Sequence, residues 1–171
     1  MGGIRAGARQ RFFRFFARPL GHKFRSMTKE VVVLIADDDP GHVRLIEKNL
    51  SRAGLHNPIE RFANGQEILD FLFGRGPRRR AGEAPYLLLL DIRMPKVDGV
   101  EVLRQIKADP ELKKMPVIML TTTDDPREVE NCHALGCSNY VVKPVDYEKF
   151  AHAIKQFGLF IALVQVPEVR A

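Results

Sequence analysis

Four consecutive leucines at positions 87–90 constrain the fold of this chain more than any other stretch of its sequence. They belong to the segment YLLLLD (86–91), in which every residue before Asp91 is apolar or aromatic. A strand with this composition has no polar face. Strands buried on both faces occur in parallel sheets that are covered by helices on each side. The sequence therefore predicts a doubly covered strand with a lone carboxylate at its end.

The same pattern of a buried strand followed by a helix recurs along the chain. Strands are predicted where apolar and β-branched residues run without interruption, at residues 31–36, 58–62, 86–91, 116–121 and 139–143. Helices are predicted where capping residues precede apolar residues at helical spacing, between residues 39 and 54, 64 and 73, and 99 and 108, and from residues 125 and 146 onward. The segment GRGPRRRAGEAP (74–85) is predicted to be a loop. Five strands alternating with five helices indicate an α/β domain with a doubly wound, five-stranded parallel sheet.

The composition fits one domain whose charge is unevenly distributed. The chain has 171 residues, 45% of them hydrophobic, which is enough for a single core. Eight of its 27 basic residues lie within residues 1–29, which leaves 19 basic and 21 acidic residues over residues 30–171. The net charge of +6 is therefore no argument for nucleic-acid binding by the domain. The longest apolar run, FGLFIALV (157–164), is too short to cross a membrane.

Three regions are predicted along the chain: a basic, disordered extension (1–28), the folded domain (29–165) and a tail (166–171). Arg alternates with Phe pairs in the extension, so a helix there would be basic and amphipathic, as suits an anionic membrane or a nucleic acid. Because Met27 opens the natural domain start MTKEVVVLIADDD, the extension is interpreted as disordered or as a misassigned start, without a function. Cys132 and Cys137 lack a metal-ligand pattern and are predicted to be free, buried thiols.

Charged and hydroxyl side chains follow four of the predicted strands. They are Asp37, Asp38 and Asp39 just after the first strand, Asp91 at the end of the third, Thr121 at the end of the fourth and Lys143 at the end of the fifth. Ligands bind beyond the carboxyl ends of strands in open parallel sheets, so these side chains are expected to converge. Two carboxylates about 4 Å apart repel each other by roughly 4 kcal/mol at an effective dielectric constant of about 20, so the cluster requires a cation, and its oxygen ligands suit Mg²⁺. A carboxylate beside Mg²⁺, a lysine and a hydroxyl can hold an acyl phosphate, which makes Asp91 the predicted phosphoacceptor.

At these residues the chain resembles the response-regulator receiver domains of two-component signalling. The resemblance runs from about residue 31 to residue 163. Its parts are the pair Asp37-Asp38, the segment LLLLDIRMPKVDG with Asp91, the Thr121 of VIMLTTTD, and YVVKP with Tyr140 and Lys143. Each part alone is weak evidence, but their order and spacing together are specific. The resemblance implies the flavodoxin-like, CheY-like form of the α/β fold.

The resemblance also implies a metal site and an acceptor. Asp38 and Asp91 are expected to bind Mg²⁺ directly, together with the backbone carbonyl of Arg93, and Asp37 is expected to act mainly through metal-bound water. Asp91 is expected to accept phosphate from the phosphohistidine of a histidine kinase. Arg93, two residues beyond the acceptor, is expected to slow the loss of phosphate by pairing with it or by crowding the attacking water.

Three further residues are implied to respond to the phosphoryl group. Lys143 would pair with its oxygens, and Thr121 would move to form a hydrogen bond with it. Tyr140 would then turn inward to fill the space that Thr121 leaves. The peptide bond between Lys143 and Pro144 is expected to be cis.

Several conspicuous residues are predicted to have structural roles. Asp39 and Asp98 are expected to cap helices rather than to bind metal or phosphate. His42 and His133 are expected to be surface or helix residues without a ligand role, and the PRRR run at residues 77–80 is expected to be a solvated loop.

Two other classes of protein compete with the receiver hypothesis. Phosphatases of the haloacid-dehalogenase type also place a nucleophilic aspartate after a buried strand, but they need a second aspartate where this chain has Arg93. A DNA-binding regulator needs an output domain, and only 28 residues follow Lys143. The prediction is therefore a stand-alone receiver that is not an enzyme, lies in the cytoplasm and acts by binding another protein, with neither nucleic acid nor membrane as its partner.

The long loop before YLLLLD and the ending VDYEKFAHAIKQFGLFIALVQVPE resemble single-domain regulators paired with phytochrome-type histidine kinases. The last helix has a core-facing stripe of Phe150, Ile154, Phe157 and Ile161. Phe160, Leu163 and Val164 are apolar as well, so the end of the helix is apolar nearly all round. This excess of apolar surface predicts a homodimer through the last helix and the strand NYVVK (139–143). The alternative is that this end of the helix packs against the edge of the sheet.

Overall fold

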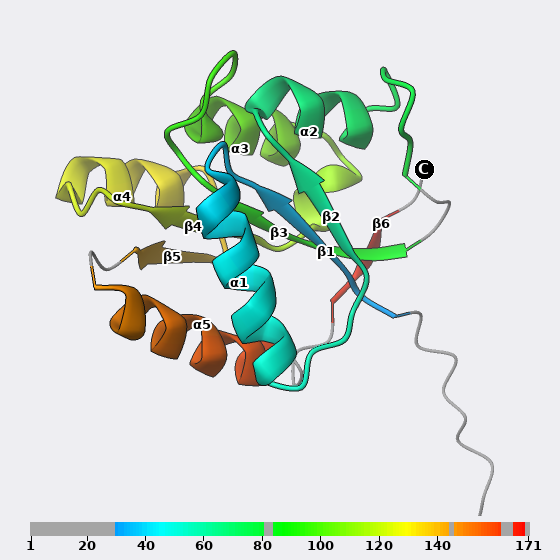
Figure 1. The fold of residues 1–171 in the computed structure, drawn as a ribbon. Coiled ribbons are helices and arrows are strands. Elements are labelled where there is room, and N and C mark those ends of the chain that lie inside the picture. The colour runs from blue at the N-terminus through cyan, green and yellow to red at the C-terminus, as the bar shows by residue number, and fades with distance from the viewer. Residues whose placement is uncertain (1–29, 81–83, 144–145, 162–165, 170–171) are drawn as a thin grey trace, which may run out of the picture.

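A sheet of parallel strands lies between two layers of helices (Figure 1). The structure, a computed structural model, describes residues 30–80, 84–143, 146–161 and 166–169. Its strands are β1 (Val32–Ala36), β2 (Ile59–Phe62), β3 (Ala84–Leu90), β4 (Val117–Thr121), β5 (Asn139–Val142) and β6 (Glu168–Val169). Its helices are α1 (Pro40–Arg52), α2 (Gly65–Leu72), α3 (Gly99–Ala108), α4 (Pro126–Ala134), α5 (Tyr147–Ile161) and the short 3₁₀ helix η1 (Leu112–Lys114).

The five parallel strands have the order β2-β1-β3-β4-β5, which confirms the predicted fold class. The chain first moves outward from β1 to β2 and then returns to the other side of β1 to form β3. In the register of the sheet, Ala36 of β1 lies opposite both Phe62 of β2 and Leu90 of β3. The order of the strands therefore reverses beside β1, which leaves a crevice at the carboxyl ends of β1 and β3.

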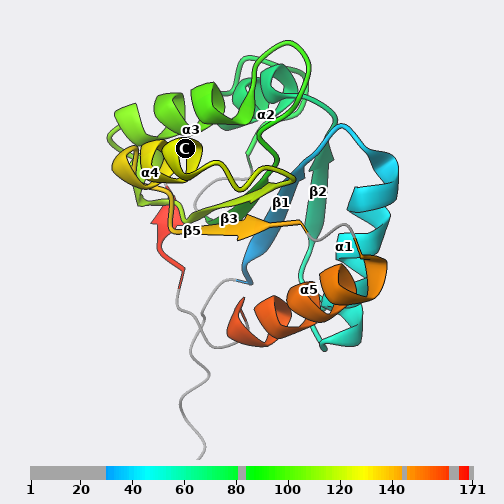
Figure 2. The same ribbon diagram turned by 90° about the vertical axis from the view of Figure 1, so that its left-hand side faces the viewer.

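The leucines of β3 contribute to both hydrophobic cores of the domain. Leu88 and Leu90 belong to the core beneath α2, α3 and α4, whereas Leu87 and Leu89 belong to the core beneath α1 and α5. Figure 2 shows these two groups of helices on opposite faces of the sheet. Each of the four side chains is at most 2% exposed. The prediction of a strand without a polar face is therefore confirmed.

Side-chain caps fix the beginnings of four helices close to the strand ends. The capping residues are Asp39 of α1, Asn64 of α2, Asp98 of α3 and Asp125 of α4. Asp39 accepts hydrogen bonds from the backbone nitrogens of Gly41 and His42, and Asp98 accepts one from the backbone nitrogen of Glu101. These contacts confirm the structural roles predicted for Asp39 and Asp98.

The end of the chain and the start of β3 differ from the prediction. β3 begins at Ala84, inside the predicted loop, and Ala84 and Pro85 pair with the antiparallel strand β6. β6 lies inside the predicted tail, and its Val169 is fully buried in the core beneath α2 and α3. A pair of residues is too short to show strand periodicity, and this strand forms only because the tail returns to β3.

Some predictions fall on residues that the structure does not describe. They are the basic extension (1–28), Pro144 with its predicted cis bond, and Leu163 and Val164 of the predicted dimer surface. Cys132 and Cys137 are described, and both are buried free thiols as predicted. Within the described ranges, no helix has the length and the apolar character that crossing a bilayer requires.

Two glycines bring the loop after β3 into close contact with its surroundings. A β-carbon added to Gly99 would overlap the backbone carbonyl group of Asp91, and one added to Gly65 would overlap that of Val97. The hydrogen bond from the Gly99 nitrogen to the Ile92 oxygen, 2.9 Å long, closes the same loop. These contacts fix the backbone that carries Asp91.

We expect Gly65→Ala and Gly99→Ala each to lower the free energy of unfolding by about 2 kcal/mol or more, because backbone atoms must move to admit the methyl group. Urea denaturation would measure this change. Gly76→Ala is the matched control, since its added β-carbon would meet the Asp70 β-carbon at 3.4 Å, an ordinary contact. Equal stability of all three variants would contradict this account of the loop.

Candidate functional site

The predicted site residues meet at the carboxyl edge of the sheet. Asp37 and Asp38 directly follow β1, Asp91 follows β3, Thr121 ends β4 and Lys143 follows β5. Backbone hydrogen bonds extend the ladder beyond the strands, from the Asp91 nitrogen to the Ala36 oxygen at 2.8 Å and from the Lys143 nitrogen to the Thr121 oxygen at 2.6 Å. The sheet itself therefore holds these residues side by side.

Three carboxylates form a cluster at this edge. Asp37, Asp38 and Asp91 each offer one oxygen, and these oxygens all lie within 4.8 Å of one another. Asp37 and Asp91 are buried, whereas Asp38 is exposed. Such a cluster of oxygen ligands with one side open to solvent suits a hard divalent cation.

Lys143 places a buried ammonium group between two of these acids. Its Nζ atom lies 2.7 Å from Oδ2 of Asp37 and 3.3 Å from Oδ1 of Asp91. The residue is only 5% exposed, so both ion pairs are shielded from water. The lysine compensates part of the negative charge of the cluster and leaves the remainder for another cation.

The environment of Asp91 disfavours its ionised form. Burial is the main cause that raises the pKa of this carboxyl group, and the nearby charge of Asp37 raises it further. Lys143 acts in the opposite direction and lowers the pKa through its charge and its hydrogen bond. A divalent cation that balances the excess negative charge would therefore relieve the repulsion within the cluster.

Thr121 and Tyr140 are linked through the residue between them in space, Thr123. The Thr121 residue is completely buried, and its Oγ1 accepts a hydrogen bond of 3.3 Å from the Thr123 nitrogen. The Tyr140 hydroxyl donates to the Thr123 oxygen at 3.1 Å. Burial and the charge of Glu128 raise the pKa of Tyr140 to about 12, so the hydroxyl keeps its proton.

The side chain of Arg93 reaches α4. Its Nη2 atom lies 3.0 Å from Oε1 of Glu128, and its side chain is 67% exposed. The guanidinium group thus lies beside the first turn of α4, and the predicted pairing with phosphate would require it to move.

The comparison with protein families decides what kind of domain carries this site. The family model of the response regulator receiver domain matches residues 33–155, well over half of the chain. This chain belongs to the response regulator receiver family. Receivers of this family are the response regulators of two-component systems, and nothing in the comparisons supports the phosphatase alternative.

Individual relatives agree with the family match. Response regulator Rcp1 of Synechocystis is 31% identical over 131 residues, which are 75% of this receiver and 88% of Rcp1. The Mn²⁺-bound structure of Rcp1 superposes with a TM-score of 0.70 at 27% identity, covering 80% of this chain and 98% of that one.

Two other solved structures superpose more closely. A response regulator receiver domain from Rhodospirillum rubrum has a TM-score of 0.77 at 44% identity, with 82% of this chain and 99% of that chain covered. The phosphorylated cyanobacterial phytochrome response regulator RcpA has a TM-score of 0.74 at 28% identity, with 81% and 99% covered. The predicted resemblance to regulators of phytochrome signalling is thereby confirmed.

His42 is a site neighbour that the sequence reasoning missed. Its Nδ1 atom lies 3.4 Å from Nζ of Lys143 and 3.6 Å from Oδ1 of Asp37. The side chain is 37% exposed and lies on a helix, as predicted, but its ring borders the buried part of this receiver's pocket. Its position in the first turn after β1, at the same sheet edge as Asp37, is the signal that could have identified it.

A cavity of about 310 Å³ opens beside the acids of the receiver, between α1 and the loop that joins β2 to α2. Asp37, Asp38, Arg44 and Arg61 are among the residues that line it. The exposed side of the carboxylate cluster is therefore accessible to a small donor or a cation.

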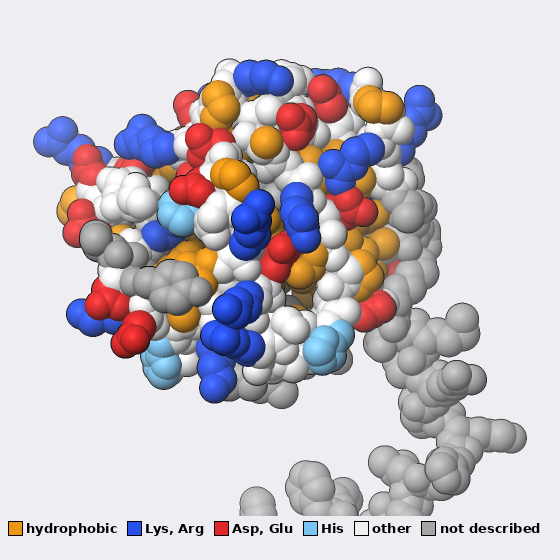
Figure 3. All heavy atoms as spheres, viewed as in Figure 1, with side chains coloured by type: hydrophobic (Ala, Val, Ile, Leu, Met, Phe, Trp, Pro, Cys, Tyr) orange, Lys and Arg blue, Asp and Glu red, His pale blue; other side chains and the backbone are white. Residues whose placement is uncertain are grey.

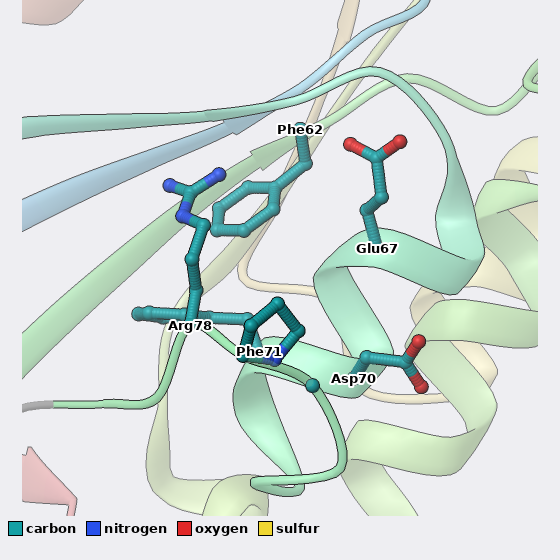
Figure 4. Close-up of a pocket in the computed structure, with 7 residues that line it drawn as sticks. Phe62, Glu67, Asp70, Phe71 and Arg78 are labelled. Atoms are coloured by element: carbon teal, nitrogen blue, oxygen red, sulfur yellow. The ribbon is translucent and has the colours of Figure 1, made fainter.

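A second cavity, of about 170 Å³, lies between β2, α2 and the loop after α2 (Figure 4). The guanidinium of Arg78 lies 4.8 Å from the centre of the Phe62 ring and forms an ion pair with Glu60. In Figure 4 the carboxylate of Asp70 points away from the Phe62 and Phe71 rings. Arg78 thus attaches the loop to β2, which corrects the prediction that the whole PRRR run is simply solvated.

We expect Mg²⁺ or Mn²⁺ to raise the free energy of unfolding of the wild type, by about 2.7 kcal/mol at a hundred times the dissociation constant. Asp91→Asn should lose most of this increase, whereas Asp98→Asn, a change in a helix cap at the same edge, should keep it. Thermal unfolding with and without the cation would measure the effect. Equal stabilisation of wild type and Asp91→Asn would contradict the metal site.

Without a divalent cation, Asp91→Asn should itself stabilise the fold near neutral pH. Because the folded-state pKa of Asp91 is raised above its ordinary value of 3.8, wild-type stability falls as the pH rises from that value through the raised pKa. The advantage of the asparagine variant should therefore be absent at low pH and appear as the pH increases.

Proposed function

We propose that Asp91 accepts a phosphoryl group from a histidine kinase and that the receiver transmits this signal by binding another protein. The observation that carries the proposal is the environment of Asp91. Asp91 is 7% exposed, and its carboxylate lies 3.3 Å from the Lys143 ammonium in a cluster with two further carboxylates. An oxygen nucleophile, a fixed cation and a set of metal ligands are thus placed together.

The acids and one backbone group are proposed to hold a divalent cation, with Mg²⁺ as the physiological ion. The ligands would be Asp38, Asp91 and the backbone carbonyl of Arg93, with Asp37 acting mainly through water. When bound, the ion neutralises charge on the phosphoryl oxygens. The Mn²⁺-bound structure of the relative Rcp1 supports a divalent site of this kind.

In the proposed transfer, a carboxylate oxygen of Asp91 attacks the phosphorus of a phosphohistidine. The new oxygen–phosphorus bond forms as the nitrogen–phosphorus bond breaks, and the electron pair of that bond returns to the imidazole of the kinase. Lys143 then exchanges its contact with the Asp91 carboxylate for contacts with the phosphoryl oxygens. The product is an acyl phosphate on the protein, so the domain is a phosphoacceptor with intrinsic chemistry and not an enzyme.

Thr121 and Tyr140 are proposed to convert the modification into a change at the surface. If Oγ1 of Thr121 turns toward the phosphoryl group, its hydrogen bond from the Thr123 nitrogen breaks. The Thr123 oxygen, which now holds the Tyr140 hydroxyl, is then free to shift. This chain of contacts gives a route by which Tyr140 is released and turns inward.

The proposed donor is a histidine kinase of the phytochrome type. The support comes from the relative RcpA, a cyanobacterial phytochrome response regulator. Basic side chains gather over α1 beside the acid pocket (Figure 3), where Arg44, Lys48 and Arg52 are all exposed at a spacing of one helical turn. A kinase with an acidic docking surface would fit this side of the receiver. We further propose that the receiver lies in the cytoplasm and binds neither nucleic acid nor membrane.

Incubation with a divalent cation and a small acyl phosphate should add one hydroxylamine-labile phosphate to the protein. Asp91→Asn should abolish the labelling, because it removes the proposed nucleophile and leaves Asp37, the other acid that contacts Lys143, in its proposed role toward the metal. Intact-protein mass spectrometry followed by peptide mapping would measure it.

Asp98→Asn is the control for this experiment, because it removes an acid from the same edge and keeps a capping side chain. Phosphate mapped to a residue other than Asp91, or labelling that persists in EDTA, would overturn the assignment.

The receiver is also proposed to form a two-fold dimer through α5 and β5. The support is the apolar sequence of the last helix and Val142 of β5, a large hydrophobic side chain that is 39% exposed. The side chains at residues 157–161 lie outside the described part, so the helix contributes through its sequence alone.

Light scattering at micromolar concentration, with and without the acyl phosphate, should detect this dimer. Phe160→Asp should dissociate it, while Gln156→Asp, an equal change of charge at an exposed position of α5, should not. A monomer in both states would exclude the proposed interface.

A further inference from the structure

An ion pair joins the loop that carries the acceptor to the first turn of α4. Arg93 of the loop and Glu128 of the helix approach to 3.0 Å between Nη2 and Oε1. The partners differ in exposure, because the Arg93 side chain is 67% exposed and the Glu128 side chain only 16%. Glu128 is therefore the fixed member of the pair, and Arg93 is the member that is free to move.

Glu128 depends on this arginine for its charge balance. Its other oxygen, Oε2, is buried and has no hydrogen-bond partner among the described residues. The position in the first turn of α4 favours a negative charge, because the positive end of the helix dipole is there. The ion pair with Arg93 is thus the side-chain contact that the structure gives the Glu128 carboxylate, and it is a charge-assisted one.

Phosphorylation would offer Arg93 a second anion. Asp91 is two residues away along the chain, and a phosphoryl group there carries up to two negative charges and several acceptor oxygens. The planar guanidinium group suits phosphate oxygens as well as it suits a carboxylate. The same side chain thus has two competing partners, one on α4 and one on the acceptor.

We propose that Glu128 is a positioning residue that acts through Arg93: it holds the guanidinium group away from Asp91 and thereby shortens the lifetime of the phosphoryl group. This inference rests on the proposed role of Asp91 as phosphoacceptor. Glu128 forms no ion pair with the carboxylate cluster of Asp37, Asp38 and Asp91, so its influence on Asp91 passes through Arg93.

The competition works in both directions, because coupling between two sites is reciprocal. When the phosphoryl group draws Arg93 away, Glu128 loses its cation beside Tyr140. The charge of Glu128 and that of Arg93 both affect the pKa of Tyr140, which places the three side chains in one neighbourhood. Release of Arg93 would therefore leave Glu128 as a free acceptor for the hydroxyl of Tyr140 when that hydroxyl leaves Thr123.

The test is a double-mutant cycle of wild type, Glu128→Gln, Arg93→Gln and the double variant. Each protein is phosphorylated with a small acyl phosphate, and the first-order loss of phosphate from Asp91 is followed. Glu128→Gln should slow this loss by about threefold, the size of effect expected of a largely exposed ion pair. Arg93→Gln should accelerate the loss, and in that background Glu128→Gln should have no effect.

Two further variants separate positioning from a structural role. Glu130→Gln removes the same charge from an exposed site on α4 and should leave the rate unchanged. Arg93→Lys keeps the positive charge, so the slowing by Glu128→Gln should persist in that background. The same slowing in the Arg93→Gln background, or an equal slowing by Glu130→Gln, would overturn the proposal.

A measurement on the wild type avoids any variant that fails to fold. Adding Mg²⁺ and beryllofluoride, which mimics the phosphoryl group, should shift the Nε resonance of Arg93 in a nitrogen-15 spectrum. The Nε resonance of Arg104, which pairs with Glu101 on α3, should not move. An unchanged Arg93 resonance with the mimic bound would refute the competition, whereas failure of the mimic to bind and of Asp91 to be labelled would refute the proposed function itself.

Discussion

The ammonium group of Lys143 is the interaction on which the rest of the site depends. The parallel sheet brings Asp37 and Asp91 to one edge, and the covering helices exclude water from both. Lys143 contacts each of them while only 5% exposed, so its charge offsets part of the negative charge of this pair in the absence of bulk solvent. Three carboxylates and one ammonium leave two negative charges in the cluster. That remainder equals the charge of one divalent cation, which connects the buried ion pairs with the proposed metal chemistry.

Much of the fold can be predicted because its signals are local. The leucine run predicts a strand covered on both faces, and the pairs Asp39-Pro40 and Asp125-Pro126 predict helix starts, as the structure confirms. The convergence of the strand-end residues also follows from the sequence, since parallel strands share a carboxyl edge. Contacts between distant, flexible side chains cannot be predicted in this way. Arg93 and Glu128 come from different segments, and nothing in either segment specifies its partner.

Two sets of contacts lead from the carboxyl edge of the sheet toward α4 and β5. One passes from Thr121 through the backbone of Thr123 to the hydroxyl of Tyr140. The other passes from Arg93 through an ion pair to Glu128 on α4. Both routes meet near Tyr140, whose pKa of about 12 reflects burial and the charge of Glu128. These contacts connect the carboxyl edge of the sheet with α4 and β5.

The short strand β6 has a consequence for how the molecule behaves among its copies. β3 pairs with β1 from Tyr86 onward and with β4 from Leu88 onward, so Ala84 and Pro85 extend beyond both neighbours. Projecting strand ends of this kind can recruit strands from other molecules and begin aggregation. β6 occupies that position, and its buried Val169 closes the adjoining apolar surface. β6 therefore protects this end of β3, the end opposite the carboxylate cluster, from pairing with strands of other molecules.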